Sequence, residues 1–342
     1  MQNWQIVFTG VNTAELLQTE YRAPREKEVA VATAFSTVSC GTEKANIMGN
    51  PHIAPLVPEE KASVTFPRQA GYSSAGTVIA TGKNVERVKA GDRVVVYWGK
   101  HAKYNTVPES QIVKIEEENL SFQEAALSFI ATFPLAAIRK TRLEIGEAAL
   151  VMGLGLLGQL AIRLLRAAGA VPIVGIDPVE ARRLEALHGG ADYVLDPAEK
   201  NFADVVREKT HGGANVAIEV TGVGAGLNGA LDCMARFGRV ALLGCTRNKD
   251  FTVDYYRKVH FPGITLIGAH TMARPSYESH PGYFTHEDDI KAVLRLCESR
   301  RIDLKSMIKE VHSPQECPEV YQRLVCEADF PVAVQFDWRK VP

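Results

Sequence analysis

A glycine-rich segment near the middle of the chain has the spacing of a phosphate-binding loop. The segment is Gly153-Leu154-Gly155-Leu156-Leu157-Gly158, here called the glycine loop, with the apolar run ALVM before it and QLAIRLLRAAG after it. In a strand–loop–helix unit the first glycine permits the turn, the second lets a pyrophosphate approach the backbone, and the third lets helix and strand pack closely. The N–H groups that open the helix would then bind the phosphates. The alternative is that these glycines only permit a tight strand-to-helix turn.

A carboxylate follows the next apolar run. Asp177 comes 19 residues after Gly158, at the end of the sequence VPIVGID. A carboxylate at this point can accept hydrogen bonds from both hydroxyls of an adenosine ribose and would repel a 2′-phosphate, so we predict NAD(H) rather than NADP(H) as the cofactor. Arg182 follows on the next predicted helix and can reach the adenine or the ribose. Asp177 could also be the N-cap of that helix, and the two roles can coexist.

Small residues end two further apolar runs. Thr221-Gly222 follows the predicted fourth strand of this region, and Gly244-Cys245-Thr246 follows the fifth. Because ligands of open α/β sheets bind at the carboxyl ends of the strands, we predict that Thr221, Gly222 and Gly244 line the cofactor cleft.

The hydrophobic pattern around these motifs predicts a parallel sheet. From Ala148 to about Ala269, short apolar runs alternate with amphipathic runs. The six predicted strands are Ala148–Met152, Pro172–Ile176, Tyr193–Leu195, Val216–Val220, Arg239–Leu243 and Ile264–Gly268. The helices predicted between them are Gln159–Ala168, Glu180–His188, Phe202–Thr210 and Leu227–Met234. This alternation is typical of βαβ units whose sheet is covered on both faces.

The flanks of this region have other patterns. Residues 1–118 contain short β-rich runs separated by turn formers, which predicts a small barrel or sandwich. Ser121-Phe122-Gln123-Glu124 has the spelling of a capping box and predicts the start of a helix. Near the C-terminus we predict helices at Glu287–Ser299 and Pro314–Ala328 and a strand at Pro331–Phe336. The expected segments are therefore 1–120, 121–270 and 271–342.

Composition excludes several classes of protein. The chain has 342 residues, with 39 Lys and Arg against 40 Asp and Glu, so a broad basic surface for nucleic acid is not expected. No apolar run is long enough to cross a bilayer, and the N-terminus does not resemble a signal peptide. The six cysteines are scattered and include no CxxC pair, which favours reduced thiols. We expect a cytoplasmic protein that binds no membrane.

With these motifs the chain resembles the medium-chain dehydrogenase/reductase superfamily over nearly its whole length. The resemblance rests on SCGTE at 39–43, AGYSSAGTV at 70–78, KAGDRV at 89–94, HAKYNTVP at 101–108 and the glycine loop. It implies a GroES-like, mostly β catalytic domain that is completed by the C-terminal segment, with a Rossmann domain between them. The expected fold class is therefore α/β: a doubly wound parallel sheet plus a GroES-like domain.

The resemblance also implies a catalytic zinc, from which this sequence departs. Family members bind the ion through a Cys, the His of a Gly-His-Glu triplet, and a third Cys or Glu. Here Cys40 is present, but the triplet reads Gly71-Tyr72-Ser73, and the neighbourhood of the third ligand, Ala126–Ile130, offers no thiolate or carboxylate. A catalytic zinc needs about three protein ligands, so we predict no metal and interpret Cys40 as a small buried hydrophobic residue.

Two further points concern zinc. The four-cysteine lobe that holds the structural zinc of the family is absent, because Tyr97-Trp98-Gly99-Lys100 leads directly into the HAKY motif. We therefore predict no structural zinc either. The alternative is a rebuilt catalytic site that combines Cys40 with His52, His101 or Glu43.

Without a metal, side chains must handle the charge that builds on a substrate oxygen during hydride transfer. Thr42 lies at the hydroxyl-relay position of the family and can pass a proton. Tyr72 stands where the zinc-binding His would be, and a phenol can serve as an acid or donor when a cation lies near. Lys44 is one such cation and a candidate substrate-binding residue. The competing interpretations are a packed tyrosine ring and a solvated lysine.

Three further candidates come from the same resemblance. His101 is expected at a strand junction that faces the cleft. His270 and Arg274 follow the last Rossmann strand, where family members approach the nicotinamide, and Arg274 can bind a carboxylate or phosphate. The competing interpretations are histidines that hydrogen-bond the fold and an arginine in an ion pair.

These observations predict an NAD(H)-dependent oxidoreductase that acts on a secondary alcohol or ketone, with sugars, polyols and their acid derivatives as candidate small-molecule substrates. The alternatives are a zinc-free enone or quinone reductase and an NAD(H)-binding sensor without turnover. By analogy with family relatives, the sixth strand at Thr265–Ile267 would pair across a two-fold axis, so we expect a homodimer or homotetramer.

Overall fold

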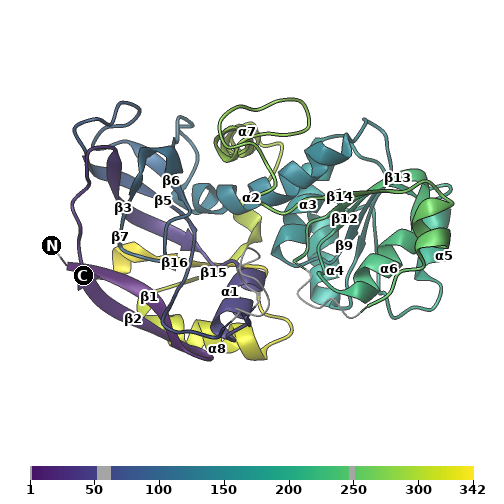
Figure 1. The fold of residues 1–342 in the computed structure, drawn as a ribbon, viewed down its shortest axis with the longest axis horizontal. Coiled ribbons are helices and arrows are strands. Elements are labelled where there is room, and N and C mark those ends of the chain that lie inside the picture. The colour runs from purple at the N-terminus through teal and green to yellow at the C-terminus, as the bar shows by residue number, and fades with distance from the viewer. Residues whose placement is uncertain (1, 52–62, 246–250) are drawn as a thin grey trace. The chain divides into compact units, whose positions relative to one another are not determined.

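The computed structural model describes residues 2–51, 63–245 and 251–342 (Figure 1). The chain divides into two compact units. The first contains Met1–Ile130, Ile290–Arg300 and Leu304–Pro342, and the second contains Ala131–Asp289 and Arg301–Asp303. The first unit is therefore built from both ends of the chain.

The first unit is β-rich, as predicted. Within its described residues, β2 (Thr13–Glu20), β1 (Gln2–Gly10) and β4 (Arg68–Gln69) form one sheet in that order. A larger sheet has the order β15 (Ile308–His312), β16 (Ala333–Asp337), β3 (Glu28–Thr37), β5 (Ser73–Thr81), β6 (Arg93–Tyr97) and β8 (Ile112–Lys114), and β7 (Tyr104–Pro108) also pairs with β3. Because β16 is antiparallel to β3, the C-terminal segment completes this sheet.

The core of the first unit joins the N-terminal hairpin to the C-terminal segment. Helix α8 (Cys317–Cys326) buries Tyr321 against Phe8 of β1, with ring centroids 4.9 Å apart in an edge-to-face arrangement. Helix α1 (Cys40–Ile47) contributes Ile47 to the same core. The sequence analysis did not predict α1, because only Glu43 and Ile47 of its residues are buried and it lacks an apolar period.

The second unit contains the predicted doubly wound sheet. In its described residues the strands have the order β11 (Tyr193–Leu195), β10 (Ile173–Ile176), β9 (Ala149–Met152), β12 (Ala214–Glu219), β13 (Met234–Leu242) and β14 (Thr265–Gly268), all parallel. This is the Rossmann order 3-2-1-4-5-6. The intervening helices are α3 (Leu156–Ala167), α4 (Glu180–His188), α5 (Phe202–Lys209) and α6 (Gly224–Asp232) (Figure 1).

Several boundaries in this unit differ from the prediction, most of all the start of β13, which we predicted at Arg239 and which lies at Met234. The sequence pattern placed Met234 at the end of a helix, but α6 ends at Asp232 and Met234 opens β13, where it is paired with Ala214. The alternation of apolar residues is short here, and sheet pairing decides the residue's conformation.

Helix α2 (Phe122–Thr141) begins at the predicted capping box. The Ser121 N–H donates to Glu124 Oε2 at 3.1 Å, and the Glu124 N–H donates to Ser121 Oγ at 3.3 Å. The division between the units falls inside α2, after Ile130, and again inside α7 (His286–Glu298), after Asp289.

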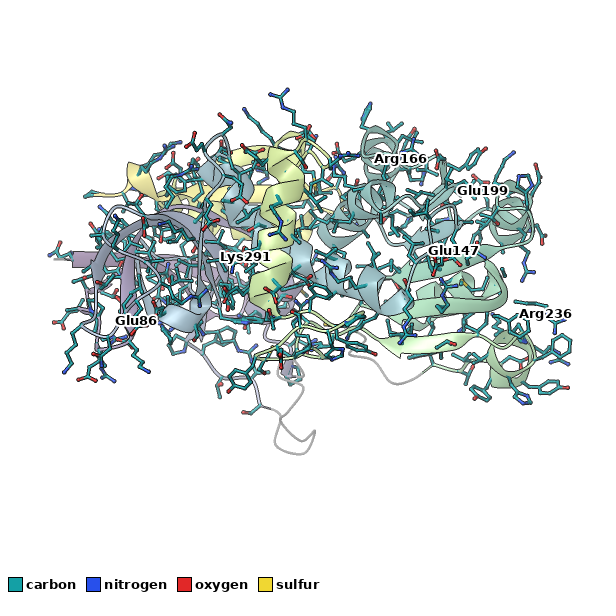
Figure 2. The ribbon with its side chains drawn as sticks, turned by 90° about the horizontal axis from the view of Figure 1, so that it is seen from above. Glu86, Glu147, Arg166, Glu199, Arg236 and Lys291 are labelled. Atoms are coloured by element: carbon teal, nitrogen blue, oxygen red, sulfur yellow. The ribbon has the colours of Figure 1, made fainter. Side chains whose placement is uncertain are left out.

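Two further features concern the surface and the helices. Charged side chains of both signs lie on the surface, such as the exposed Arg166 and Glu199 of the second unit (Figure 2). Among the described helices, each is too short or too polar to span a membrane.

Candidate cofactor and catalytic residues

The glycine loop joins β9 to α3. Two of its positions require glycine, one because of its backbone conformation and the other because of close packing. Gly153 has a φ of +97°, which favours glycine. A Cβ on Gly158 would lie 2.0 Å from the carbonyl oxygen of Gly153, so only glycine fits there. Gly155 is different, because a Cβ on it would meet nothing within 4 Å. The loop therefore leaves open space at the position where a pyrophosphate would approach the backbone.

The first turn of α3 faces the same loop. Gly155 is the N-cap, and Leu156 and Leu157 are the first helical residues. The N–H groups of a first turn have no acceptor inside their own helix, so those of Leu156, Leu157 and Gly158 suit an anion. The residues of the glycine loop thus fit a dinucleotide.

Asp177 follows β10 and ties it to the glycine loop. Its side chain is buried, with Oδ2 accepting the Leu154 N–H at 2.8 Å and Oδ1 accepting the Val179 N–H at 2.9 Å. The N-cap of α4 is Val179 and no side chain caps it, so the alternative role of Asp177 as N-cap is not what the structure has. Arg182 Nη1 lies 3.9 Å from Asp177 Oδ2. A carboxylate offers about four lone-pair sites, which leaves acceptor capacity for ribose hydroxyls.

The ends of β12 and β13 approach each other closely. A Cβ on Gly244 would lie 2.4 Å from the Gly222 nitrogen, and a Cβ on Gly222 would lie 2.9 Å from the Cys245 oxygen. The Thr221 N–H and hydroxyl both donate to Glu219 Oε1, the former at 2.8 Å. Burial raises the pKa of Glu219. The sequence analysis missed Glu219, although a carboxylate that ends an otherwise apolar strand is a visible signal.

The segment after β14 is held by two cations. Lys140 of α2 donates from Nζ to the carbonyl oxygens of Gly268 at 3.0 Å and Ala273 at 2.5 Å. Arg274 Nε donates to the Thr271 oxygen at 3.0 Å. His270 is exposed, and its Nδ1 accepts the Met272 N–H at 3.2 Å. Lys140, which the sequence analysis missed, therefore fixes the segment that carries His270.

Arg274 is part of a buried ion pair. Its guanidinium, 3% exposed, donates from Nη1 to Asp289 Oδ2 at 3.1 Å and from Nη2 to the Thr132 oxygen at 3.0 Å. Arg139 Nε donates to the other oxygen of Asp289 at 2.9 Å. The ion-pair interpretation of Arg274 thus describes its contacts, and the direct grip on a substrate anion expected from the sequence has little accessible surface to support it.

Tyr72 lies immediately before β5 in the first unit. Its ring packs beside Trp98, with centroids 5.6 Å apart, and edge-to-face with Phe129 at 5.9 Å. Its hydroxyl donates to Ser39 Oγ. Tyr72 is therefore both a packed ring and a half-buried hydroxyl with a polar partner.

His101 is fully buried and its ring nitrogens contact two side chains. Nδ1 lies 2.6 Å from Ser36 Oγ, and Nε2 lies 3.1 Å from Glu43 Oε2. Glu43 also accepts the Tyr321 hydroxyl. Burial acts to raise the pKa of Glu43, but the charge and hydrogen bond of His101 and the Tyr321 hydroxyl outweigh it and lower that pKa. With 0% of its surface exposed, His101 does not face a cleft as expected: burial and the Glu43 pair hold it inside the unit.

The remaining candidates lie on α1. Thr42 and Lys44 are half-buried there. Cys40 Sγ contacts the backbone carbonyl oxygens of Val38, Pro331 and Val332 at 3.8–3.9 Å.

The residues described do not fit a catalytic zinc. Within the described ranges, no three His, Cys, Asp or Glu side chains gather into a group that could hold a metal ion. Of the rebuilt site, His52 lies outside the described residues, and Glu43 and His101 are paired with each other. The zinc-free site stays a prediction.

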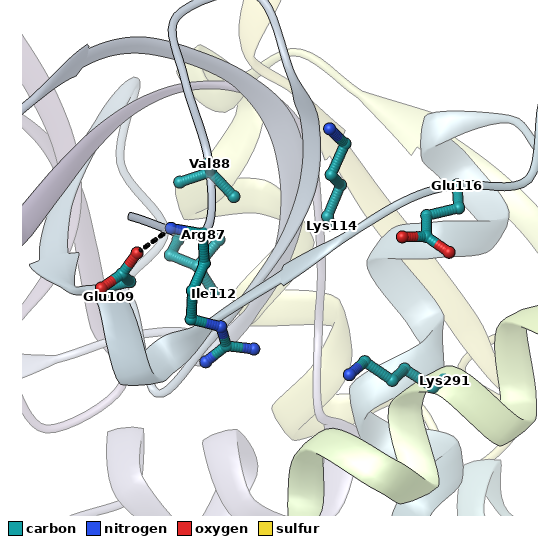
Figure 3. A pocket seen from close by; sticks show the side chains of 7 residues that line it. All are labelled: Arg87, Val88, Glu109, Ile112, Lys114, Glu116 and Lys291. Carbon is teal, nitrogen blue, oxygen red and sulfur yellow. Dashed lines mark hydrogen bonds between the residues drawn. The ribbon is translucent and has the colours of Figure 1, made fainter. Parts of the chain in front are cut away.

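A separate hollow of about 160 Å³ lies on the first unit (Figure 3). Three cations and two carboxylates are among the residues that line it: Arg87, Lys114, Lys291, Glu109 and Glu116. None of the predicted site residues lines this hollow.

Comparisons with known proteins agree with this fold. Residues 25–117 match the alcohol dehydrogenase GroES-like domain, and residues 157–281 match the zinc-binding dehydrogenase family. The chain is 31% identical over 234 residues to (R,R)-butanediol dehydrogenase of Bacillus subtilis, which covers 60% of this chain and 66% of that protein. It is 25% identical over 339 residues to D-guloside 3-dehydrogenase of Escherichia coli, which covers 94% and 95%. The crystal structure of 2R,3R-butanediol dehydrogenase from Bacillus subtilis superposes with a TM-score of 0.82, at 22% identity over 98% of this chain and 99% of that one.

The chain belongs to the medium-chain dehydrogenase/reductase superfamily, as the sequence motifs predicted. It is an oxidoreductase of the alcohol dehydrogenase-like type.

Alanine at Gly158 should lower stability, whereas alanine at Gly155 should weaken cofactor binding. Gly158→Ala should lower the free energy of unfolding by about 3 kcal/mol or more, because its Cβ overlaps the backbone. Gly155→Ala should leave thermal unfolding within a few degrees of wild type and weaken NADH binding, because its Cβ enters open space. Thermal denaturation and calorimetry measure the two effects. Unweakened NADH binding by a folded Gly155→Ala variant would contradict the assignment of the loop.

His286 should make stability depend on pH. Burial, and then the charge of Arg274, lowers the pKa of His286 to about 3. An unfolded histidine takes up a proton near pH 6.5, whereas the folded one does not until about pH 3, so stability should fall as the pH drops through this window. His286→Gln should remove that part of the slope in urea titrations at several pH values. The control is His188→Gln at an exposed position of α4, and an equal slope in both variants would refute the expectation.

Proposed function

We propose that this protein is an NAD(H)-dependent oxidoreductase that transfers hydride between the nicotinamide and a secondary alcohol or ketone, without a catalytic zinc. The observation that carries the proposal is the glycine loop, where a Cβ on Gly155 would meet nothing within 4 Å and the preceding N–H, that of Leu154, donates to the buried Asp177 carboxylate. When bound, the cofactor would supply the hydride or accept it at nicotinamide C4.

The residues of the second unit would hold the cofactor. The N–H groups of Leu156, Leu157 and Gly158 would bind the pyrophosphate, and Asp177 would accept the ribose hydroxyls. Arg182 would lie beside the ribose or adenine, and Thr221, Gly222 and Gly244 would line the cleft. This geometry supports NAD(H) over NADP(H), since a 2′-phosphate would meet a carboxylate.

Side chains would handle the substrate oxygen. We propose Tyr72 as the hydrogen-bond and proton donor, with Thr42 and His270 as further donors and Lys44 as the nearby cation. His101 and Arg274 would influence the substrate without touching it, because both are buried and paired with carboxylates: His101 with Glu43 and Arg274 with Asp289. The relatives named above are dehydrogenases of a butanediol and of a D-guloside, which supports an alcohol, polyol or sugar derivative as the substrate here.

A zinc-free enone or quinone reductase is the second candidate. The described residues contain no group of three metal-binding side chains, which permits this candidate as it does the first. Asp177 counts against it, because by the family resemblance such reductases usually take NADPH. A panel of secondary alcohols, ketones and enones with each cofactor separates the two, because only the first candidate would oxidise alcohols. An NAD(H) sensor would bind the cofactor and turn over nothing in the panel.

The cofactor assignment is tested by calorimetry. NADH should bind more tightly than NADPH, and Asp177→Asn should weaken NADH binding by about 10-fold and narrow the preference. The control is Glu199→Gln, which removes an exposed carboxylate of the same unit. Elemental analysis of the purified protein should find zinc well below one ion per chain. Tighter binding of NADPH would defeat the NAD(H) assignment, and stoichiometric zinc would defeat the zinc-free one.

We also propose that copies of the chain pair through β14 into a homodimer or homotetramer. Strand β14 is at the edge of the sheet order, and Thr265, Leu266 and Gly268 are exposed. An exposed edge of this kind readily pairs with another chain. Light scattering should give a multiple of the 37.4 kDa chain mass. Leu266→Lys should lower the mass, whereas Ile145→Lys, at an exposed apolar residue away from β14, should not. A wild-type monomer would refute the proposal.

A further inference from the structure

We propose that Ser39 is a positioning residue for Tyr72 and that the buried pair of Glu43 and His101 holds Ser39 in place. The inference rests on the proposed function in taking Tyr72 as the group that handles the substrate oxygen. It assigns a positioning role to three buried polar side chains, Ser39, Glu43 and His101.

The ring of Tyr72 has a fixed orientation. Trp98 and Phe129 pack against it, and the Trp98 N–H donates to the Tyr72 carbonyl oxygen at 2.9 Å. Trp98 has a φ of +57°, a left-handed conformation that is strained for a residue with a side chain. The fold therefore tolerates backbone strain at the residue that packs beside Tyr72, as is common near functional sites.

The oxygen of Tyr72 also has a fixed partner, because its hydroxyl donates to Ser39 Oγ. Ser39 is 6% exposed, so water competes little for this contact. In ketone reduction the carbonyl carbon would accept hydride from NADH. The Tyr72 O–H would turn from Ser39 Oγ to the carbonyl oxygen and give it the proton, while the Ser39 hydroxyl would rotate and donate to the Tyr72 oxygen in its place. That hydrogen bond would stabilise the phenolate until Tyr72 regains a proton from water.

The backbone of Ser39 is held by Glu43. The Ser39 N–H donates to Glu43 Oε1 at 2.8 Å, and the Glu43 N–H donates to the Ser39 carbonyl oxygen at 2.8 Å. Glu43 is 2% exposed, so hydrogen-bond donors of the protein must replace water around its carboxylate, and the Ser39 N–H is one of them. Ser39 cannot move without leaving a buried carboxylate short of a hydrogen bond.

A chain of hydrogen bonds fixes Glu43 in turn. Trp338 Nε1 donates to Ser36 Oγ at 2.8 Å, and Ser36 Oγ lies 2.6 Å from His101 Nδ1. His101 Nε2 lies 3.1 Å from Glu43 Oε2, so both ring nitrogens of the buried histidine have a polar partner. This series of hydrogen bonds links Trp338 of the C-terminal segment to Ser39. It gives the buried His101 a positioning role.

The test compares Ser39 with a matched serine. Ser39→Ala should lower kcat for ketone reduction by about 10-fold or more while the KM and the NADH dissociation constant change by less than about 3-fold. Ser39→Thr retains a hydroxyl and should restore most of the rate. Ser74→Ala is the control, because Ser74 is also buried but its hydroxyl has no partner among the described residues. Thermal unfolding should be similar in all three variants.

A second measurement is independent of turnover. Protein labelled with 3-fluorotyrosine gives a ¹⁹F resonance for Tyr72 that Tyr72→Phe identifies. This resonance should shift in Ser39→Ala and stay in place in Ser74→Ala. An unmoved resonance in Ser39→Ala would overturn the contact, and a moved resonance with wild-type kcat would overturn the positioning role. A moved resonance in a protein that turns over no alcohol or ketone would support the contact and overturn the proposed function instead.

Discussion

Buried carboxylates that accept backbone N–H groups hold the loops on which the proposed chemistry depends. Asp177 accepts the Leu154 N–H of the glycine loop, Glu219 accepts the Thr221 N–H after β12, and Glu43 accepts the Ser39 N–H before α1. A buried carboxylate is costly unless several donors satisfy it, and the donors here belong to the loops themselves. Loss of a loop conformation would therefore leave a charge without its partners, which makes each loop conformation specific.

After β14 the backbone is held by cations instead, which donate to its carbonyl oxygens. Lys140 donates to two backbone carbonyl oxygens of the segment that carries His270, and Arg274 donates to a third while it pairs with Asp289. Burial, and next the charge of Arg274, lowers the pKa of Lys140. Both cations thus serve the shape of the segment, whereas the sequence alone suggested that Arg274 would bind substrate.

The Tyr72 region is where we expect this chain to depart from the zinc-type family. Tyr72 packs against two aromatic rings and its hydroxyl donates to Ser39, and we propose that this phenol stands in place of the family's imidazole ligand. A series of hydrogen bonds runs from Trp338 through Ser36 and His101 to Glu43, which in turn holds the backbone of Ser39. Hydrogen bonds can orient a proton donor as firmly as a metal orients a bound oxygen, provided that each is shielded from water.

The sequence by itself determined the features that depend on local spacing. The strand–helix alternation, the glycine loop, the position of Asp177 and the capping box at Ser121 all follow from residues within about 25 positions of one another, and each has the conformation expected. Only the tertiary structure decided what the isolated polar residues do. His101 and Glu43 are 58 residues apart, and Tyr321 and Glu43 are 278 apart, so no local pattern could pair them. A hydrogen bond or ion pair depends on the partner that the fold brings within reach, and that partner is invisible in the residue's own neighbourhood.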